Sequence, residues 1–275
     1  MSQSSRPDYL LGTNKTELDR LCFQHTVWKP VTDRFFDRLG VGSGWRCLDV
    51  GAGPGFVAKD LHARVGEQGE ITVLEPSPYY LNWFRSETAR LGWKNVRFIH
   101  GTVEQSTLPH DQFDLIFVRW VMSFVTDLEQ FLAPLFAALK PGGIVAAQDY
   151  YYEGLSLFPH GGAFDKMPDA VREYYKRGGG DAYVAGRLPG IFRKYGLSLI
   201  DFTPVCLAGG PRSDIMEWAH RFFTVHTQSM VDKGIVSQVE GDAMVADWLV
   251  HRGNPDALFF SPLVVNVAGR RGDQT

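Results

Sequence analysis

The sequence has few cysteines, no long apolar run and no excess of positive charge. Cys22, Cys47 and Cys206 are its three cysteines, widely spaced and without a C-x-x-C pair. This pattern indicates neither a disulfide framework nor a zinc site, and it is typical of a reducing cytoplasm. No run of about eighteen apolar residues occurs, and the first residues lack the basic and apolar regions of a signal peptide. We therefore expect a cytoplasmic protein that does not span a membrane.

Acidic and basic residues nearly balance, with 31 Asp and Glu against 28 Lys and Arg and a formal net charge of -3. The basic residues are scattered, whereas binding of a phosphate backbone needs a basic stripe, so we expect no nucleic-acid partner. The length of 275 residues and the hydrophobic fraction of 44% suit one mid-sized α/β domain with an elaboration. The oligomeric state, monomer or homo-oligomer, stays open.

Short β-rich runs alternate with helical patterns through the first half of the chain, which predicts a parallel sheet with helices on its faces. We expect five strands here, at residues 45–51, 69–75, 95–101, 113–119 and 143–150. Before the last strand, apolar residues recur at helical spacing from Leu128 to Leu139, and Lys140-Pro141-Gly142-Gly143 ends that helix. The spacing predicts an amphipathic helix packed on the sheet.

The second half follows a different pattern. Residues 151–180 are rich in glycine and aromatic side chains, and we assign no regular element to them. A helix is expected around 183–195, then a sixth strand at 198–208 and a seventh at 261–270. The roughly fifty residues between those two strands have a helical pattern and are too many for an ordinary loop. We interpret about 209–258 as a helical lid, within a remainder of the sheet that runs from 151 to 275.

A glycine-rich loop follows the first expected strand, where residues 48–56 read LDVGAGPGF. Gly51, Gly53 and Gly55 let the backbone turn sharply and let a ligand lie against bare main chain, with the amides of a helix start facing it. Glu75 ends the next strand, where its carboxylate is placed to accept both ribose hydroxyl hydrogens. Loop, helix start and acid together predict a nucleoside site. The alternatives are an ordinary glycine turn and a solvated charge at a strand end.

The sequence resembles the class I S-adenosylmethionine-dependent methyltransferases over about residues 40–150. LDVGAGPGF is similar to the first motif of that family, and Leu74-Glu75-Pro76 resembles its acidic strand end. Residues 101–104 (GTVE) resemble the adenine loop, 113–116 (FDLI) the fourth strand and 139–143 (LKPGG) the turn before the fifth. The resemblance implies a Rossmann-like α/β fold with a seven-stranded, mostly parallel sheet whose last strand is antiparallel. It also implies S-adenosyl-L-methionine as cofactor, bound by a core at residues 41–150.

The resemblance assigns roles to single residues of that core. It implies that Asp49 and the backbone near Gly51 and Gly53 hold the methionine portion of the cofactor, with Gly55 in the same loop. Glu75 would bind the ribose.

The same resemblance extends to the adenine and to the far end of the cofactor. It implies that Pro76 packs on the adenine, whose edge meets the Thr102 side chain and the Val103 amide. Many relatives have aspartate where Thr102 stands, which leaves its bond to the adenine amine open. Arg119, at the carboxyl end of the fourth strand, would line the amino-acid end of the cofactor. A surface charge is the alternative for Arg119.

An N-terminal segment resembles a helix found in a bacterial small-molecule branch of the family. Residues 20–28 (RLCFQHTVW) are similar to a helix that closes over the cofactor there, which implies Gln24 as a partner of the methionine carboxylate. We expect residues 1–40 to form this helical segment. Residues 186–189 (GRLP) and 259–262 (FFSP) are similar to the tail of the same branch. The resemblance names no substrate.

A dinucleotide-dependent dehydrogenase is the nearest alternative, since it also uses glycines, a helix start and a strand-end acid. Its fingerprint is G-x-G-x-x-G, whereas this loop is G-x-G-x-G and continues with Phe56. Two terminal strands separated by a lid also suit the methyltransferase sheet better.

The acceptor side offers candidate bases beyond the fifth strand, because ligands in such sheets sit outside the strand carboxyl ends. Tyr151 and His160 are the candidates for catalysis, with Tyr150 and Tyr152 beside them; a solvated loop histidine and tyrosine packing are the alternatives. The sulfonium methyl is already activated, so orientation supplies about 7–11 kcal/mol against about 3–5 kcal/mol from a base. A missing base is therefore no objection.

One helical face of the lid carries Ile215, Trp218, Ala219, Phe222 and His226. We expect Trp218, Phe222 and His226 to contact the substrate, with ordinary core packing as the alternative. Other aromatic residues suit the same flat or apolar acceptor: Phe158, Phe164, Tyr174, Phe223 and Trp248. The substrate is accordingly expected to be a small, largely apolar metabolite.

We predict an enzyme that works without a metal ion. His220 and His226 leave opposite faces of their helix, and Asp149-Tyr150 stands where metal-dependent catechol-type relatives have an Asp-Asn pair. The predicted reaction is in-line methyl transfer to oxygen, nitrogen or carbon of the metabolite. A catalytically silent cofactor-binding module of the same fold is the alternative.

Overall fold

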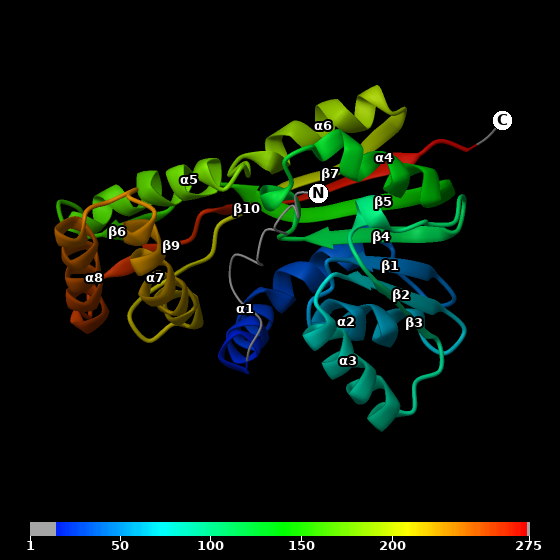
Figure 1. Ribbon diagram of the computed structural model, residues 1–275, viewed down its shortest axis with the longest axis horizontal. Helices are drawn as coiled ribbons and strands as arrows, with labels where there is room; N and C mark the ends of the chain where they lie inside the picture. Colours follow the sequence, from blue (N-terminus) through cyan, green and yellow to red (C-terminus); the bar gives the residue numbers. More distant parts are fainter. Residues whose placement is uncertain (1–14, 274–275) are drawn as a thin grey trace, which may run out of the picture.

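The predicted strands assemble into one seven-stranded sheet of order β3-β2-β1-β4-β5-β10-β7. The computed structural model, in which residues 15–273 are described, places helices on both faces of this sheet (Figure 1). The strands have these bounds: β1 Arg46–Val50, β2 Glu70–Glu75, β3 Val96–His100, β4 Phe113–Arg119, β5 Leu139–Tyr151, β7 Leu197–Val205 and β10 Leu263–Arg271. The Rossmann-like α/β prediction is confirmed.

The direction of the strands determines where a ligand site can form. β1 pairs in parallel with β2 and β4, and the register sets Asp49 beside Val73 and Phe117. β10 is antiparallel to both β5 and β7, as expected for the last strand. The carboxyl ends of β1, β2, β4 and β5 therefore meet at one edge of the sheet, and β1 and β4 form the point at which the strand order reverses.

Two separate apolar cores hold helices against the faces of the sheet. Phe35 and Phe36 of α1 (Lys15–Leu39) share one core with α2 (Phe56–Val65) and α3 (Pro78–Leu91). α4 (Leu128–Ala138) and α6 (Val184–Lys194) share the other. Asp127 caps α4 by accepting a hydrogen bond from the Gln130 amide, which fixes where this helix begins.

The remaining elements form a third core at the end of the sheet where the parallel strands finish (Figure 1). This group contains α5 (Met167–Arg177), α7 (Asp214–Asp232) and α8 (Gln238–Gly253). A second sheet, of order β6-β9-β8, lies with them and has these strands: β6 Ser156–Phe158, β8 Ala208–Gly209 and β9 Leu258–Phe260. Short 3-10 helices connect the elements: η1 Val103–Gln105, η2 Met122–Phe124 and η3 Ala163–Lys166.

Three features differ from the sequence-based expectations. Residues 151–180 contain helix α5, whose start carries Pro168, a residue favoured in the first helical turn but easily taken for a breaker. The expected strand 198–208 is divided, because β7 ends at Val205 and β8 joins the small sheet. The strands of the small sheet have two or three residues each and are too short to show alternation. Within residues 15–273, no helix has the length and apolarity needed to cross a bilayer.

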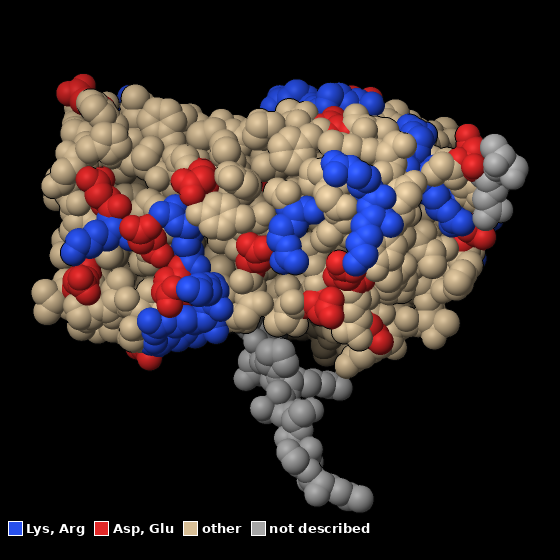
Figure 2. Space-filling view, turned by 90° about the horizontal axis from the view of Figure 1, so that it is seen from above, with Lys and Arg blue, Asp and Glu red and all other residues tan. Residues whose placement is uncertain are grey.

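Charged side chains are mixed on the face seen from above, where basic groups lie beside acidic ones (Figure 2). The expectation that the chain does not bind nucleic acid stays a prediction.

Candidate active site

The three glycines of the loop after β1 all have left-handed backbone angles, with φ of 65° at Gly51, 53° at Gly53 and 76° at Gly55. A Cβ on Gly51 would lie 2.4 Å from a methyl group of Val121, and one on Gly55 would lie 2.4 Å from the Phe84 ring. These two glycines are therefore required for packing. A Cβ on Gly53 would meet nothing within 4 Å, so the main chain there faces open space.

Glu75 lies directly against this loop, as the sequence analysis expected. One carboxylate oxygen accepts a hydrogen bond from the Gly53 amide at 2.8 Å, and the other accepts one from the Ser77 amide at 2.8 Å. The side chain is only 3% exposed, and burial raises its pKa while the two amides oppose that rise. The carboxylate is thus held rigidly beside the open space over Gly53.

Asp49 is buried near the end of β1, and the partly buried Arg119 at the end of β4 acts on it through its charge. Burial raises the pKa of Asp49 to about 7, against the opposing effect of the Arg119 guanidinium. The Ala58 amide in the first turn of α2 donates to the Asp49 carboxylate, whereas Oδ2 has no hydrogen-bond partner among the described residues. Burial also lowers the pKa of Arg119 to about 10, so it remains a cation at neutral pH. An unpartnered buried acceptor of this kind suits a cationic ligand group.

Helix α1 closes this end of the site through Arg119. The guanidinium donates to Thr32 Oγ1 at 3.2 Å and lies 3.1 Å from His25 Nδ1. Burial and the Arg119 charge lower the pKa of His25 to about 3, which keeps this imidazole neutral. Thr32 in turn donates to Gln148 of β5 at 2.8 Å, which ties α1 to the sheet.

Gln24 directly precedes His25 in α1, lies about two turns before Thr32 and contacts α7. Its Oε1 accepts hydrogen bonds from Arg20 and from the indole of Trp218, each at 3.1 Å. A methionine carboxylate would accept a hydrogen bond from the Gln24 Nε2 group rather than from Oε1, so these contacts do not oppose the predicted bond, which stays a prediction. The part of the predicted segment 1–40 that precedes Lys15 lies outside the described residues.

Pro76, Thr102 and Val103 lie around the end of β2, where an adenine ring is expected. Pro76 is exposed, and its carbonyl accepts a hydrogen bond from His100 at 3.0 Å. Thr102 precedes η1 and its hydroxyl makes no capping bond, while Val103 is buried in η1. The structure brings these residues together, and their contacts with adenine stay a prediction.

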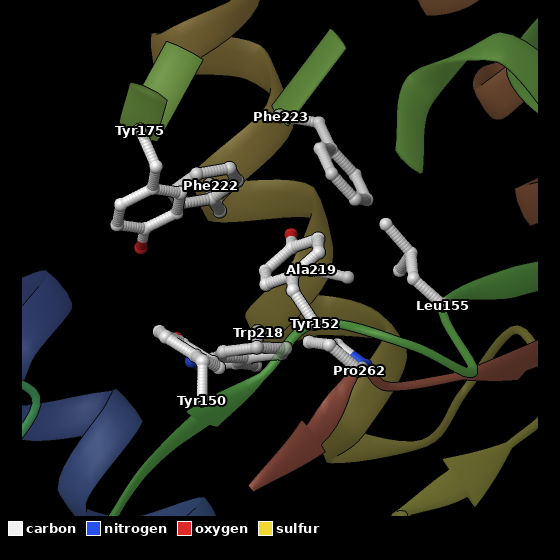
Figure 3. A pocket seen from close by; sticks show the side chains of 9 residues that line it. All are labelled: Tyr150, Tyr152, Leu155, Tyr175, Trp218, Ala219, Phe222, Phe223 and Pro262. Atoms are coloured by element: carbon white, nitrogen blue, oxygen red, sulfur yellow. The ribbon is translucent and has the colours of Figure 1, made fainter. Parts of the chain in front are cut away.

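A pocket lined mainly by aromatic side chains lies beyond the end of β5 (Figure 3). Its wall combines β5, α5, α7 and the segment before β10, and its residues are Tyr150, Tyr152, Leu155, Tyr175, Trp218, Ala219, Phe222, Phe223 and Pro262. None of these side chains carries a charge at neutral pH, since burial raises the pKa of all three tyrosines. The free space is about 10 Å³, barely room for one water, so the rings must move apart to admit a ligand.

Trp120 connects this aromatic pocket to the end of β4. Its ring stacks on Tyr150 with centroids 6.2 Å apart, and the Arg119 guanidinium lies 5.0 Å from it. Its φ of 53° is unusual for so large a side chain, and its indole nitrogen has no hydrogen-bond partner within the described chain. Strain at a bulky residue is typical of functional sites. Trp120 was not predicted as a site residue, although its position directly after an expected strand end was the available signal.

Of the three lid residues predicted to contact the substrate, two line the aromatic pocket and one does not. Trp218 and Phe222 line the aromatic pocket. His226 is buried beside Phe222, at 4.3 Å between ring centroids, but it is not among the pocket residues. Burial lowers the pKa of His226 to about 3. Their contacts with substrate stay predictions.

The two candidate bases do not line the aromatic pocket. Tyr151 points to the other face of β5, where its ring packs at 5.2 Å from Tyr183. The side chain of His160 is 65% exposed and lies 3.7 Å from Asp165, at a second cavity. Instead, the structure places Tyr150, Tyr152 and Tyr175 in the pocket, of which Tyr175 was not considered because no helix was expected there.

The other aromatic residues named from the sequence take different positions. Phe223 lines the aromatic pocket and Phe164 lines the second cavity. Trp248 is buried against both of them, and Tyr174 is buried beside His226. Phe158 is 48% exposed on β6.

Open sheets of this kind bind nucleosides where β1 and β4 diverge. The reversed β10 between β5 and β7 separates the class I methyltransferases from dinucleotide-binding folds. Residues 48–147 match the family model of a methyltransferase domain. Over residues 48–147 the chain is therefore similar to the class I S-adenosylmethionine-dependent methyltransferases, and the dehydrogenase alternative is set aside.

Relatives and solved structures agree with this assignment. The chain is 30% identical over 148 residues to a ubiquinone/menaquinone biosynthesis C-methyltransferase, UbiE, of Psychromonas ingrahamii, covering 52% of this chain and 58% of that protein. The chain thus spans little more than half of that relative. A putative methyltransferase from Bacillus halodurans matches with a TM-score of 0.58 and 16% identity, over 86% of this chain and 98% of that one. Geranyl diphosphate C-methyltransferase from Streptomyces coelicolor matches with a TM-score of 0.57 and 13% identity, over 94% of this chain and 85% of that one.

The residues present fit S-adenosylmethionine, the methyl donor of this class. Gly53 leaves space against bare main chain, and Glu75 presents a fixed carboxylate next to it. Asp49 has an acceptor oxygen without a partner where a cationic amino group would be needed.

Substitution of Gly53 by alanine separates binding from stability. A left-handed alanine costs about 1–2 kcal/mol of folding free energy, and the added methyl occupies the open space that a ligand would use. We expect about a tenfold or greater loss of S-adenosylhomocysteine affinity by calorimetry. Gly92→Ala is the matched control, since Gly92 has φ 72° and an equally open Cβ position at the end of α3. Equal affinities of the two variants would contradict the assigned space.

Proposed function

We propose that the chain transfers a methyl group from S-adenosylmethionine to oxygen, nitrogen or carbon of a small, largely apolar metabolite. The observation that carries this proposal is the placement of two sites at neighbouring strand ends. The Gly53–Glu75 cradle follows β1 and β2, the aromatic pocket follows β5, and Arg119 and Trp120 lie at the end of β4, the strand between β1 and β5. S-adenosylmethionine supplies a methyl group already activated on a sulfonium sulfur. In this proposal, Glu75 binds the ribose of S-adenosylmethionine and Asp49 binds its ammonium group.

The protein's contribution to catalysis is orientation and exclusion of water. The Trp120 ring packs on Tyr150 of the pocket, and we expect the acceptor atom to be held near this contact, in line with the methyl group. α1 and α7 cover this region and contact each other through Trp28 and Trp218, with ring centroids 5.7 Å apart. We infer that residues 209–258 and α1 act as a lid, which separates to admit the acceptor.

The aromatic lining supports a flat or apolar acceptor, because uncharged rings reward apolar contact and stacking. Named relatives act in ubiquinone and menaquinone biosynthesis, and a fold neighbour was solved with geranyl diphosphate. Ubiquinone, menaquinone and geranyl diphosphate each have an apolar part, which supports a largely apolar acceptor for this chain. Metal-independent action, a cytoplasmic location and the oligomeric state stay predictions.

Turnover distinguishes the proposed enzyme from a silent binding module. Purified protein is incubated with methyl-labelled S-adenosylmethionine and panels of phenols, enols and amines, and labelled product and S-adenosylhomocysteine are measured. For an accepted compound, Phe222→Ala is expected to raise the acceptor KM about tenfold through lost ring contact, with an unchanged KM for the donor. Phe158→Ala, on an exposed ring outside the pocket, is the control. Cofactor binding without transfer to any panel member would favour the silent module.

A further inference from the structure

A second cavity adjoins the aromatic pocket on the side away from β4. It offers about 220 Å³ of free space, against about 10 Å³ in the pocket itself. Leu155 lines both spaces. Beside Leu155, Phe223 of the pocket and Phe164 of the cavity touch with ring centroids 4.9 Å apart. One leucine and one pair of rings therefore form the wall between the two spaces.

The arrangement is linear along the chain segment that leaves β5. Tyr150 lies at the pocket end near α1, and Leu155 lies at the opposite end of the pocket (Figure 3). Leu157 and His160 follow in the outer cavity. An extended segment from 150 to 158 covers at most about 28 Å, which sets the scale of the combined path.

The outer cavity favours an apolar occupant. Its polar side chains already have partners: Ser156 donates to the Gly154 carbonyl, and Asp165 accepts from the Gly161 amide and lies next to His160. Beside these paired polar groups, an alkyl chain would meet carbon surface on Leu155 and Pro168. Leu157 and Phe164 are each 1% exposed and form a fixed floor.

We infer that the aromatic pocket and the outer cavity form one acceptor channel, divided by Leu155, for an aryl head group that carries an apolar chain. The ring of the acceptor lies among Tyr150, Trp218 and Phe222, next to the methyl donor. Its chain passes Leu155 into the outer cavity towards His160. This inference rests on the proposed function and specifies the substrate class of the same site.

Binding of phenol, 4-butylphenol and 4-octylphenol tests the channel. Dissociation constants are measured by quenching of intrinsic tryptophan fluorescence with S-adenosylhomocysteine present. Each methylene removed from water favours binding, so the wild type should bind 4-octylphenol at least about tenfold more tightly than 4-butylphenol. Leu155→Phe narrows the wall and Leu157→Phe fills the outer cavity. Both should remove most of this gain, and Leu157→Phe, which lies outside the aromatic pocket, should leave phenol binding unchanged.

Leu258→Phe, at a 43% exposed position on β9, is the control and should keep the gain. Leu155→Ala widens the passage and should also keep the tighter binding of 4-octylphenol. This variant shows whether a change at position 155 by itself disturbs folding. The inference is overturned if both phenylalanine variants retain the full gain, if the wild type shows none, or if no phenol binds. A calorimetric titration with S-adenosylhomocysteine on the same samples separates the two levels: its failure in the wild type rejects the proposed function itself.

Discussion

Replacement of Glu75 by glutamine is expected to weaken S-adenosylhomocysteine binding about 100-fold. Hydrogen bonds to a charged group contribute about 1.5–3 kcal/mol each, and two ribose hydroxyls would lose this acceptor. The amide has only one acceptor oxygen, so its NH2 group must face either the Gly53 or the Ser77 amide, both of which are donors. The substitution therefore disturbs the backbone at Gly53 or Ser77 and also removes an acceptor for the ribose. Calorimetry of the purified variant measures the loss.

Glu70→Gln is the matched control for this change. Glu70 begins the same strand β2 at its amino end and pairs with Arg97 at 3.0 Å, far along the strand from the loop. This variant should bind like the wild type. If Glu75→Gln retained wild-type affinity, Glu75 would have no role in holding the ribose, and the nucleoside site would have to lie elsewhere.

The affinity for S-adenosylhomocysteine should rise with pH through the range in which Asp49 ionises. Burial raises the pKa of Asp49 to about 7 in the free protein, and the ammonium group of the ligand binds the carboxylate rather than the neutral acid. Binding therefore releases a proton, and protonation at low pH opposes it. From pH 5.5 to pH 7.5 the ionised fraction rises about 25-fold for a pKa near 7, and the association constant should rise in proportion.

Asp49→Asn should bind more weakly at pH 7.5 and lose most of this pH dependence. Asp114→Asn serves as the control, because Asp114 lies near the amino end of β4, where it pairs with Lys140 at 2.7 Å. It should preserve the wild-type slope. If the wild-type affinity were constant over this pH range, Asp49 would not bind the ammonium group of the ligand.

The sheet and the cofactor side of the site were predictable because their signals are local. Alternation of strands and helices fixes the parallel sheet, and the loop glycines and Glu75 follow directly from strand ends. The structure adds what spacing does not reveal, namely that Gly51 and Gly55 serve packing while Gly53 alone faces open space. Loop glycines look alike in sequence, and only the neighbours Val121 and Phe84 distinguish them.

The acceptor side was harder to predict, because its residues come together from distant segments. Tyr175 enters the pocket from α5, a helix that the glycine- and aromatic-rich composition of residues 151–180 concealed. His160 was an attractive base from its position after β5, but the chain continues into β6 and carries it to the outer cavity. The position of the Trp120 ring depends on a left-handed backbone angle, which cannot be predicted from the amino-acid composition.

The most direct test of the account is a calorimetric titration of the wild-type chain at pH 7.5 with S-adenosylhomocysteine, beside an identical titration with NADH. We predict saturable binding of one S-adenosylhomocysteine per chain in the micromolar range and no heat from NADH. Absence of S-adenosylhomocysteine binding at high micromolar concentration, in protein that is folded by circular dichroism, would contradict the assignment of the Gly53–Glu75 cradle.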